Sequence, residues 1–306
     1  MTTEQNWSLC KLPETVTVNS QRRVELECQM VLPPTDGAEN LLTITAISQS
    51  DPTLSISSQL RLKVEAEQEE LQLPAACLLY GVQDQALNDS IFFSYDPNEN
   101  MVKQLGEQCT GCDIESLAIH PLTNEIYVGS GDDAVGHPKG HLYKLNPITG
   151  ELYSVGDTGF LGISSLTFDS QGRLWSWAKG QGLATLNPDT AQGQLELPSS
   201  LELADLTWDT TSQVLYGVVG KELWSYAPTT GDVNPICDNL PTKTEALQVL
   251  PSQFLPEGFL LLGSHQNNEL KLQVFDRVSC QRITAQDIVI GYDDVEGLAM
   301  PIAACQ

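Results

Sequence analysis

Basic residues are scarce in this sequence: 15 Lys and Arg stand against 40 Asp and Glu, which leaves a formal net charge of −25 at pH 7. A surface of this kind repels the phosphate backbone of nucleic acids and anionic membrane surfaces. We therefore expect no nucleic-acid partner. The acidity is typical of proteins kept soluble by their charge, and it also suits carboxylates that meet divalent cations outside the cell.

Long apolar runs are missing as well. No stretch approaches the roughly 18 apolar residues of a membrane-spanning helix, so no membrane span is expected. The opening residues 1–6 lack the basic and apolar segments of a secretory signal. We expect either a cytosolic protein or a mature or excised piece of a longer chain.

The motifs of several enzyme classes are absent too. The sequence contains no G-x-S-x-G elbow, no P-loop, no G-x-G-x-x-G and no H-E-x-x-H. We therefore assign no catalytic residue and expect no organic cofactor.

Cysteine is present eight times, an even number that permits up to four disulfides. Cys109-Thr-Gly-Cys112 has neither a second pair nor a neighbouring histidine to complete a zinc site, so a structural disulfide is predicted there. The other cysteines are Cys10, Cys28, Cys77, Cys237, Cys280 and Cys305.

The first region, residues 1–66, alternates apolar and polar residues in the period of β-strands. Runs such as residues 24–32 and 60–64 each place their apolar residues on one face, with turn residues between the runs. Four or five strands are expected, in a region shorter than the about 100 residues of an immunoglobulin-like sandwich. The pattern resembles part of the Ig-like stalk modules of bacterial surface proteins. Residues 67–76, which begin in an acidic stretch, are predicted to be a linker because like charges repel.

The second region, residues 77–306, repeats a turn at intervals of about 40 to 50 residues. In each copy a strand ends in a tight turn, which Pro, Asn, Asp and Gly favour through a fixed φ, side-chain capping and tolerance of positive φ. The five turns lie at residues 95–100, 145–150, 186–190, 226–231 and 275–279.

Two strand patterns accompany each turn. First strands are predicted at residues 115–118, 164–167, 204–207, 245–248 and 296–299, and second strands at 79–82, 126–128, 174–177, 215–218 and 260–262. The earliest second strand has no first strand before it, and the last first strand has no hairpin after it. Together they complete one sheet, which predicts an all-β, five-bladed β-propeller closed by both ends of the region in one blade. Cys77 and Cys305 flank this seam and are predicted to form a disulfide.

The first strands also carry a recognisable motif. Asp294-Val-Glu-Gly-Leu-Ala299 and Asp113-Ile-Glu-Ser-Leu-Ala118 resemble the D-[IV]-E-G-L-A blade starts of secreted bacterial and cyanobacterial β-propeller proteins. Glu245-Ala-Leu matches in part, whereas Ser164 and Ala204 replace the glutamate in the other two repeats. The resemblance implies a secreted propeller.

Innermost strands line the axis of a propeller, so Glu115, Glu245 and Glu296 are expected at the central channel, with Asp113 and Asp294 at its mouth. Converging carboxylates repel one another unless a proton, a cation or water separates them. Ca²⁺ or Mg²⁺ suits such oxygen ligands, and these five residues are the candidate metal ligands. The alternative is structural: hydrated carboxylates that accept hydrogen bonds from inner-strand amides.

Two other groups of residues have a functional and a structural interpretation. His137 and His141 lie with Asp132 and Asp133 in a Gly-rich loop that suits either a metal ion or a plain turn. Four tryptophans suit either sugar stacking at a blade edge or packing between blades: Trp175, Trp177, Trp208 and Trp224.

We interpret the chain as an extracellular or cell-surface binding, adhesion or assembly protein that presents a propeller face to a protein or glycan. The alternative is a glycoside hydrolase or other carbohydrate-active enzyme. Five-bladed propellers also host glycosidases, whose paired acids lie about 5 to 9 Å apart, and the axial carboxylates could serve.

Overall fold

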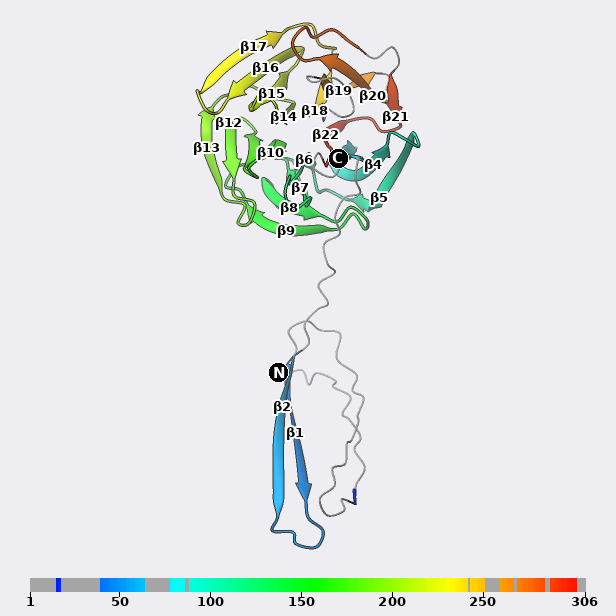
Figure 1. Cartoon of the computed structure of the whole chain (residues 1–306), viewed down its shortest axis with the longest axis vertical. Helices are drawn as coiled ribbons and strands as arrows, with labels where there is room; N and C mark the ends of the chain where they lie inside the picture. The colour runs from blue at the N-terminus through cyan, green and yellow to red at the C-terminus, as the bar shows by residue number, and fades with distance from the viewer. Residues whose placement is uncertain are drawn as a thin grey trace. The chain divides into compact units, whose positions relative to one another are not determined.

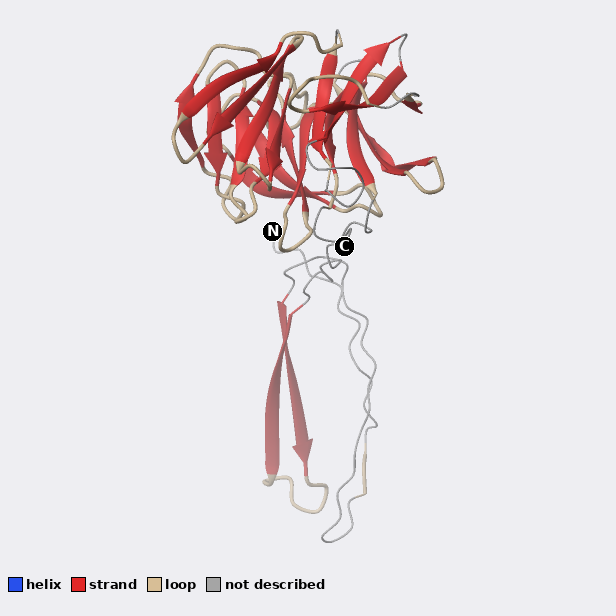
Figure 2. Ribbon diagram, turned by 45° about the horizontal axis from the view of Figure 1, so that its top comes forward, coloured by secondary structure: helices blue, strands red, loops and turns tan. Residues whose placement is uncertain are grey.

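The computed structural model describes residues 15–17, 39–63, 78–85, 88–241, 243–250, 259–266, 269–283 and 287–301. The chain divides into two compact units, Met1–Glu70 and Leu71–Gln306. All regular elements in the described ranges are β-strands apart from isolated turns, as Figure 2 shows. Within those ranges we find no helix with the length and apolarity to cross a membrane.

In the first unit the structure describes one antiparallel hairpin, β1 (Glu39–Ile47) and β2 (Ser55–Lys63). The hairpin coincides with two expected strand runs, the alternating residues 42–46 and the run at residues 60–64. The alternation of apolar and polar residues predicts that one face of each strand is buried. Ile44 and Ile56 are 41% and 75% exposed, so the described part of this unit does not cover that face of the hairpin. The other expected strands lie outside the described residues, and the Ig-like assignment stays a prediction.

The second unit contains five antiparallel sheets of four strands each, arranged radially around an axis (Figure 1). We number these sheets as blades and give their strands from the axis outward.

Blade 1 contains β22 (Val295–Ala299), β3 (Leu79–Gln85), β4 (Asp89–Asp96) and β5 (Met101–Cys109). Blade 2 contains β6 (Ile114–Ile119), β7 (Ile126–Ser130), β8 (His141–Leu145) and β9 (Leu152–Asp157). Blade 3 contains β10 (Ile163–Phe168), β11 (Leu174–Ala178), β12 (Gly182–Leu186) and β13 (Gly193–Pro198). Blade 4 contains β14 (Asp205–Asp209), β15 (Val214–Val219), β16 (Glu222–Ala227) and β17 (Asp232–Cys237). Blade 5 contains β18 (Thr244–Val249), β19 (Phe259–Gln266), β20 (Glu269–Asp276) and β21 (Ile288–Ile290).

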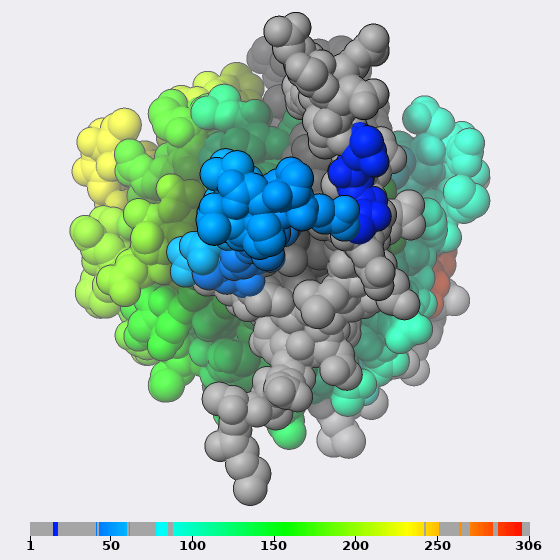
Figure 3. Space-filling model, turned by 90° about the horizontal axis from the view of Figure 1, so that it is seen from below, coloured from blue at the N-terminus to red at the C-terminus, as the bar shows by residue number. Residues whose placement is uncertain are grey.

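The five-bladed propeller and its seam are therefore confirmed. In blade 1, β22 from the end of the chain pairs with β3, with Leu298 opposite Gly81 and Ala299 opposite Tyr80. The space-filling view shows green and yellow blades on one side and the cyan of blade 1 on the other (Figure 3). Cys77 and Cys305 lie outside the described residues, so their disulfide stays a prediction.

The repeated turns join the third and fourth strands of the blades, as their chemistry predicts. In blade 2 the side chain of Asn146 accepts hydrogen bonds from the backbone N–H groups of Ile148 and Thr149, at 2.9 and 3.3 Å. Equivalent caps are made by Asp96, Asn187 and Asp276. The short polar side chain replaces a backbone acceptor within the turn, which fixes where each outer strand begins.

Each interface between neighbouring blades contains its own apolar core. The five clusters bring together residues of blades 1 and 2, 2 and 3, 3 and 4, 4 and 5, and 5 and 1. Every cluster includes one leucine from the same place on an inner strand: Leu117, Leu166, Leu206, Leu247 and Leu298. These leucines are at most 5% exposed. Burying such a side chain contributes about 1.5–3 kcal/mol, so each blade is stabilised mainly by its two neighbours.

The inner strands are also held by hydrogen bonds between blades. The N–H of Leu206 in blade 4 donates to Ser165 Oγ in blade 3 at 2.7 Å. The N–H of Leu247 in blade 5 donates to Asp205 Oδ2 in blade 4 at the same distance. Between blades 2 and 3 the earlier blade supplies the donor instead of the acceptor. Ser116 Oγ of blade 2 donates to the carbonyl of Ile163 in blade 3 at 3.0 Å.

Two disulfides lie within the described residues. Cys109 and Cys112 are joined, as predicted, in the turn that leads from blade 1 to blade 2. Cys237, at the end of β17, is joined to Cys280, just beyond β20, and this bond links blade 4 to blade 5.

The Cys237–Cys280 bond should matter more for stability than the Cys109–Cys112 bond, because it closes a loop of 43 residues instead of 3. We expect the C237S/C280S variant to lose about 2–4 kcal/mol of unfolding free energy, since longer closed loops constrain the unfolded chain more. Urea unfolding followed by tryptophan fluorescence measures this loss. The C109S/C112S variant is the control and should lose clearly less; equal losses would contradict the prediction.

Candidate functional site

Glu115, Glu245 and Glu296 occupy the same structural position on the inner strands of three blades. In each case the pairing register shifts around the glutamate, between Ile114 and Ser116 in blade 2 and at the matching residues of blades 5 and 1. Such a bulge leaves one residue out of the ladder and turns its side chain in a new direction. Ser164 occupies the same bulge in blade 3. The repeat predicted from the sequence therefore corresponds to one local backbone geometry.

The aspartates of the motif also have a common conformation. Asp113 and Asp294 each have a φ of +53°, two residues before Glu115 and Glu296. Asp and Asn are the non-glycine residues that most readily adopt this left-handed conformation. The buried side chain of Asp113 accepts a hydrogen bond from the N–H of Asp133 at 2.6 Å, and burial raises its pKa. Asp113 therefore holds the β7–β8 loop beside the axis, whereas Asp294 is exposed.

Glu296 is the most strongly perturbed acid in the group. Burial, together with the charges of Asp294, Glu245, Glu115 and Asp84, raises its pKa to about 9. Charges from blades 1, 2 and 5 thus add to burial in favouring the protonated form of Glu296. Glu296 is consequently protonated near neutral pH.

Glu115 is partly neutralised by a lysine from the next blade. Lys179, which follows β11 in blade 3, places its Nζ 2.9 Å from Glu115 Oε1 and 2.7 Å from Asp132 Oδ1. Burial raises the pKa of Glu115 to about 7 even though the hydrogen bond and charge of Lys179 lower it. The two carboxylates in turn raise the pKa of Lys179 against the effect of its own burial.

Gly131 provides the space for this arrangement. A Cβ at this position would lie 2.3 Å from the carboxyl group of Glu115 and 2.6 Å from Asp113 Oδ2. Any other residue would displace both acids, so the glycine after β7 belongs to the site.

The acids do not form a ready-made chelate. Among the described residues, no three carboxylate oxygens of this group lie within 4.8 Å of one another. The arrangement can therefore retain a proton, attract a cationic group, or hold a hydrated cation. Direct coordination of one bare ion by three glutamates would require their side chains to rotate.

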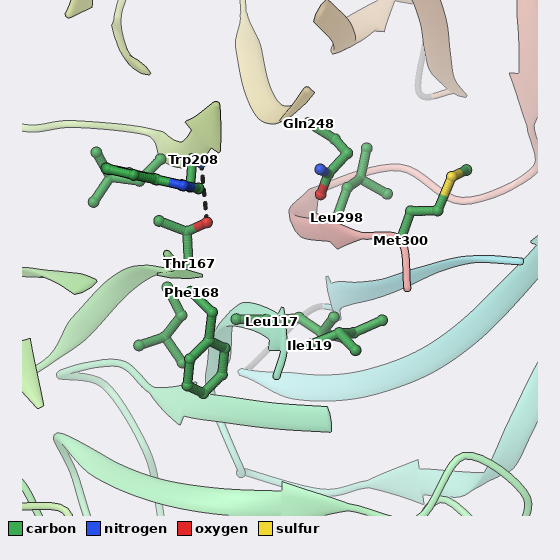
Figure 4. Close-up of a pocket in the computed structure, with 11 residues that line it drawn as sticks. Leu117, Ile119, Thr167, Phe168, Trp208, Gln248, Leu298 and Met300 are labelled. Carbon is green, nitrogen blue, oxygen red and sulfur yellow. Dashed lines mark hydrogen bonds between the residues drawn. The ribbon is translucent and has the colours of Figure 1, made fainter. Parts of the chain in front are cut away.

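Farther along the inner strands the side chains around the axis carry no charge. A cavity of about 30 Å³ is lined by residues from all five inner strands, including Leu117, Phe168, Trp208, Gln248 and Leu298. Figure 4 shows these side chains around the same space. The backbone N–H of Trp208 donates to Thr167 Oγ1. The acidic group therefore lies at one end of the inner strands, with an uncharged section beyond it.

The other sequence candidates fall into different places. His141 begins β8 and its Nε2 contacts Ser154 Oγ at 2.7 Å, while Asp132 pairs with Lys179, so the loop does not gather the two histidines around one ion. Trp175, Trp177 and Trp208 are buried between blades 3 and 4. Trp224 is partly exposed and lines, with Trp177 and Tyr226, an apolar cavity of about 200 Å³ at that interface.

Two site residues were missed in the sequence. Lys179 follows a second strand, where nothing in the repeat marks it, and only the scarcity of basic residues draws attention to it. Asp84 lies next to the last residue of the second strand of blade 1, and its charge is among those that raise the pKa of Glu296.

Comparisons with known proteins support the fold. Neither a scan against protein-family models nor a search of the curated proteins returned a match to this sequence. Among solved structures, a chain from the crystal structure of a nidogen/laminin complex superposes with a TM-score of 0.51 and 9% identity, over 74% of this chain and 99% of that chain. TolB from Acinetobacter baumannii gives a TM-score of 0.48 and 12% identity, over 79% of this chain and 62% of that chain. The five sheets of the second unit make the chain a five-bladed β-propeller protein, and the likeness to the nidogen/laminin chain, at 9% identity, bears on the fold alone.

Replacing Glu296 by Gln should change how stability depends on pH. The folded protein retains the Glu296 proton up to a pKa of about 9, against 4.5 for an ordinary glutamate. The native state therefore binds more protons than the unfolded state, and this contribution to stability is lost as pH rises from about 4.5 to about 9. We expect wild type to lose stability relative to Glu296→Gln across this range, measured by urea unfolding at several pH values. Glu107→Gln, on the exposed strand β5, is the control; a pH-independent difference for Glu296→Gln would contradict the prediction.

Proposed function

We propose that the chain is a binding protein that holds a protein partner on the acidic end of its propeller, with a hydrated Ca²⁺ or Mg²⁺ at the axis. The observation that carries the proposal is the convergence of Glu115, Glu245 and Glu296, with Asp113 and Asp294 beside them, from the starts of three inner strands. A group of acids that keeps a proton on Glu296 at neutral pH is a site where an incoming positive charge is stabilised.

The location proposed for this protein is extracellular or at the cell surface, as an adhesion or assembly component. Two disulfides among the described residues support it, because disulfides persist in oxidising compartments. The similar chain from the nidogen/laminin complex belongs to a protein–protein assembly, and the same kind of use is proposed here. Glycans remain the alternative partner class, with the partly exposed Trp224 as an aromatic residue that suits them.

The cation and the partner are proposed to depend on the same carboxylates. A cation that displaces the Glu296 proton binds more tightly as pH rises, because protons compete with it for the oxygens. A ligand present at a hundred times its Kd stabilises the folded state by about 2.7 kcal/mol.

The variant E115Q/E245Q/E296Q should abolish both kinds of binding. We expect Ca²⁺ to raise the Tm of wild type, more at pH 9 than at pH 6, and to leave the Tm of this variant unchanged. Proteins captured by wild type in Ca²⁺ from the extracellular fraction of the source organism should be lost with the variant. E99Q/E107Q/E196Q removes three exposed acids outside the axis and should behave as wild type. Equal Tm shifts in the two triple variants, or retention of the same proteins by the axial variant, would refute the proposal.

A second candidate, a glycoside hydrolase, is favoured by one observation. Glu296 and Glu115 come from adjacent inner strands and have pKa values of about 9 and about 7, and acid–base catalysis uses carboxyl groups whose pKa values are separated. If this candidate is correct, a panel of aryl glycosides should reveal turnover that falls by about 10²–10⁴-fold in Glu296→Gln or Glu115→Gln, since general acid–base groups contribute that much. Glu107→Gln should leave turnover unchanged. Absence of turnover on the whole panel would eliminate the hydrolase.

A further inference from the structure

The Cys109–Cys112 turn has a histidine beside it that the sequence does not place there. A ring nitrogen of His137, from the β7–β8 loop of blade 2, and the two sulfur atoms all lie within 4.8 Å of one another. Cys112 is 2% exposed, Cys109 is half-buried and His137 is exposed. Ligand atoms around a tetrahedral zinc ion lie about 3.6–3.8 Å apart, because Zn–S and Zn–N distances are about 2.3 and 2.0–2.1 Å. The three side chains therefore need only small movements to surround such an ion.

The turn and the loop are held together independently of the disulfide. The N–H of Gly111 donates to Asp89 Oδ1 at 2.7 Å, and the N–H of Val135 donates to the carbonyl of Gly111 at 2.9 Å. Asn88 Nδ2 donates to the carbonyl of Asp133 at 2.9 Å, which attaches the loop a second time. Gly111 has a φ of +71°, and a Cβ there would lie 2.4 Å from the carbonyl oxygen of Val135. Opening the sulfur–sulfur bond would thus leave His137 next to both cysteines.

We propose that the reduced chain binds one thiophilic divalent ion of the zinc class through Cys109, Cys112 and His137, and that the Cys109–Cys112 disulfide closes this site. Two thiolates and an imidazole are ligands that zinc prefers, and the C-x-x-C spacing lets both sulfurs reach one ion. The exposed side of His137 leaves a fourth position open to water. The site lies outside the axial carboxylates and does not depend on the proposed function.

The switch between the two states balances as a two-electron exchange. A dithiol reductant transfers two electrons and two protons to the Cys109–Cys112 bond and itself becomes a disulfide. The metal ion then displaces the two thiol protons to solvent and binds both thiolates. Reoxidation by a disulfide-bearing oxidant reverses these steps and releases the ion.

Co²⁺ is the probe, because thiolate ligands give it a charge-transfer absorption in the near ultraviolet and tetrahedral coordination gives visible bands. The full chain is reduced with a phosphine, freed of it under nitrogen, and titrated with Co²⁺ and then Zn²⁺. We expect one equivalent of Co²⁺ to produce both absorptions and Zn²⁺ to remove them, whereas the oxidised chain produces neither. Absence of the thiolate absorption in the reduced chain would overturn the proposal.

Variants locate the ion. His137→Ala should weaken Co²⁺ binding by at least roughly a hundredfold, since loss of even an indirect partner of a metal ligand costs about 10- to 100-fold. His141→Ala, in the same loop but bonded to Ser154, is the matched control and should bind as wild type. The C109S/C112S variant should lose the thiolate absorption, and E115Q/E245Q/E296Q should keep it. Unchanged binding in His137→Ala, or an absorption that survives in C109S/C112S, would overturn the site, provided near-ultraviolet circular dichroism shows that each variant is folded.

Discussion

The innermost strand of each blade is paired on one side only, and the rest of the propeller depends on how its other edge is satisfied. An unpaired strand edge buried near an axis would leave backbone N–H groups without acceptors, at a cost of about 1–3 kcal/mol for each group. Ser165, Thr167, Asp205 and Thr207 supply those acceptors from the preceding blade. Blades 3 and 4 thereby complete the inner edges of blades 4 and 5, so neither of these two edges is satisfied within its own blade.

The same constraint explains which residues surround the axis. A close approach between inner strands requires a small or hydrogen-bonding residue directly before each core leucine, and the positions hold Ser116, Ser165, Asp205, Ala246 and Gly297. At Gly297 a Cβ would lie 2.9 Å from the backbone nitrogen of Leu117 in blade 2. The small residue packs against the next inner strand, and the leucine that follows it packs in the core. The residue directly before the small one is therefore free of both packing roles, and its side chain can carry a functional group. Three blades place a glutamate there.

Much of the propeller could be predicted from the sequence because each blade repeats a local rule. The Asn and Asp turns cap themselves within a few residues, and the strands on either side follow from where those turns lie. The pairing of β22 with β3 could be predicted because the repeat lacks a first strand before β3 and lacks a hairpin after β22. The equivalent positions of the three glutamates on inner strands were predictable for the same reason, since matching residues of a closed repeat occupy matching places around its axis.

The contacts that escaped prediction depend on loops instead of on the repeat. Lys179 reaches Glu115 from the neighbouring blade, across a separation of 64 residues that no periodicity encodes. His137 lies beside Cys109 and Cys112 because Val135 attaches the β7–β8 loop to Gly111 and Asp133 attaches it to Asn88. For the first region, β1 and β2 agree with the alternation. The acceptors and the packing of its other runs fall outside the described residues, so the Ig-like assignment stays a prediction.

The pairing of Lys179 with Glu115 also breaks the equivalence of the blades. Blades 3 and 4 present Ser164 and Ala204 where the others present glutamate, and the lysine comes from blade 3. The lysine charge therefore lies to one side of the group of acids, so the charges around the axis do not repeat from blade to blade. Five sheets of similar backbone geometry thus surround an uneven distribution of charge, which rotation by one blade does not reproduce.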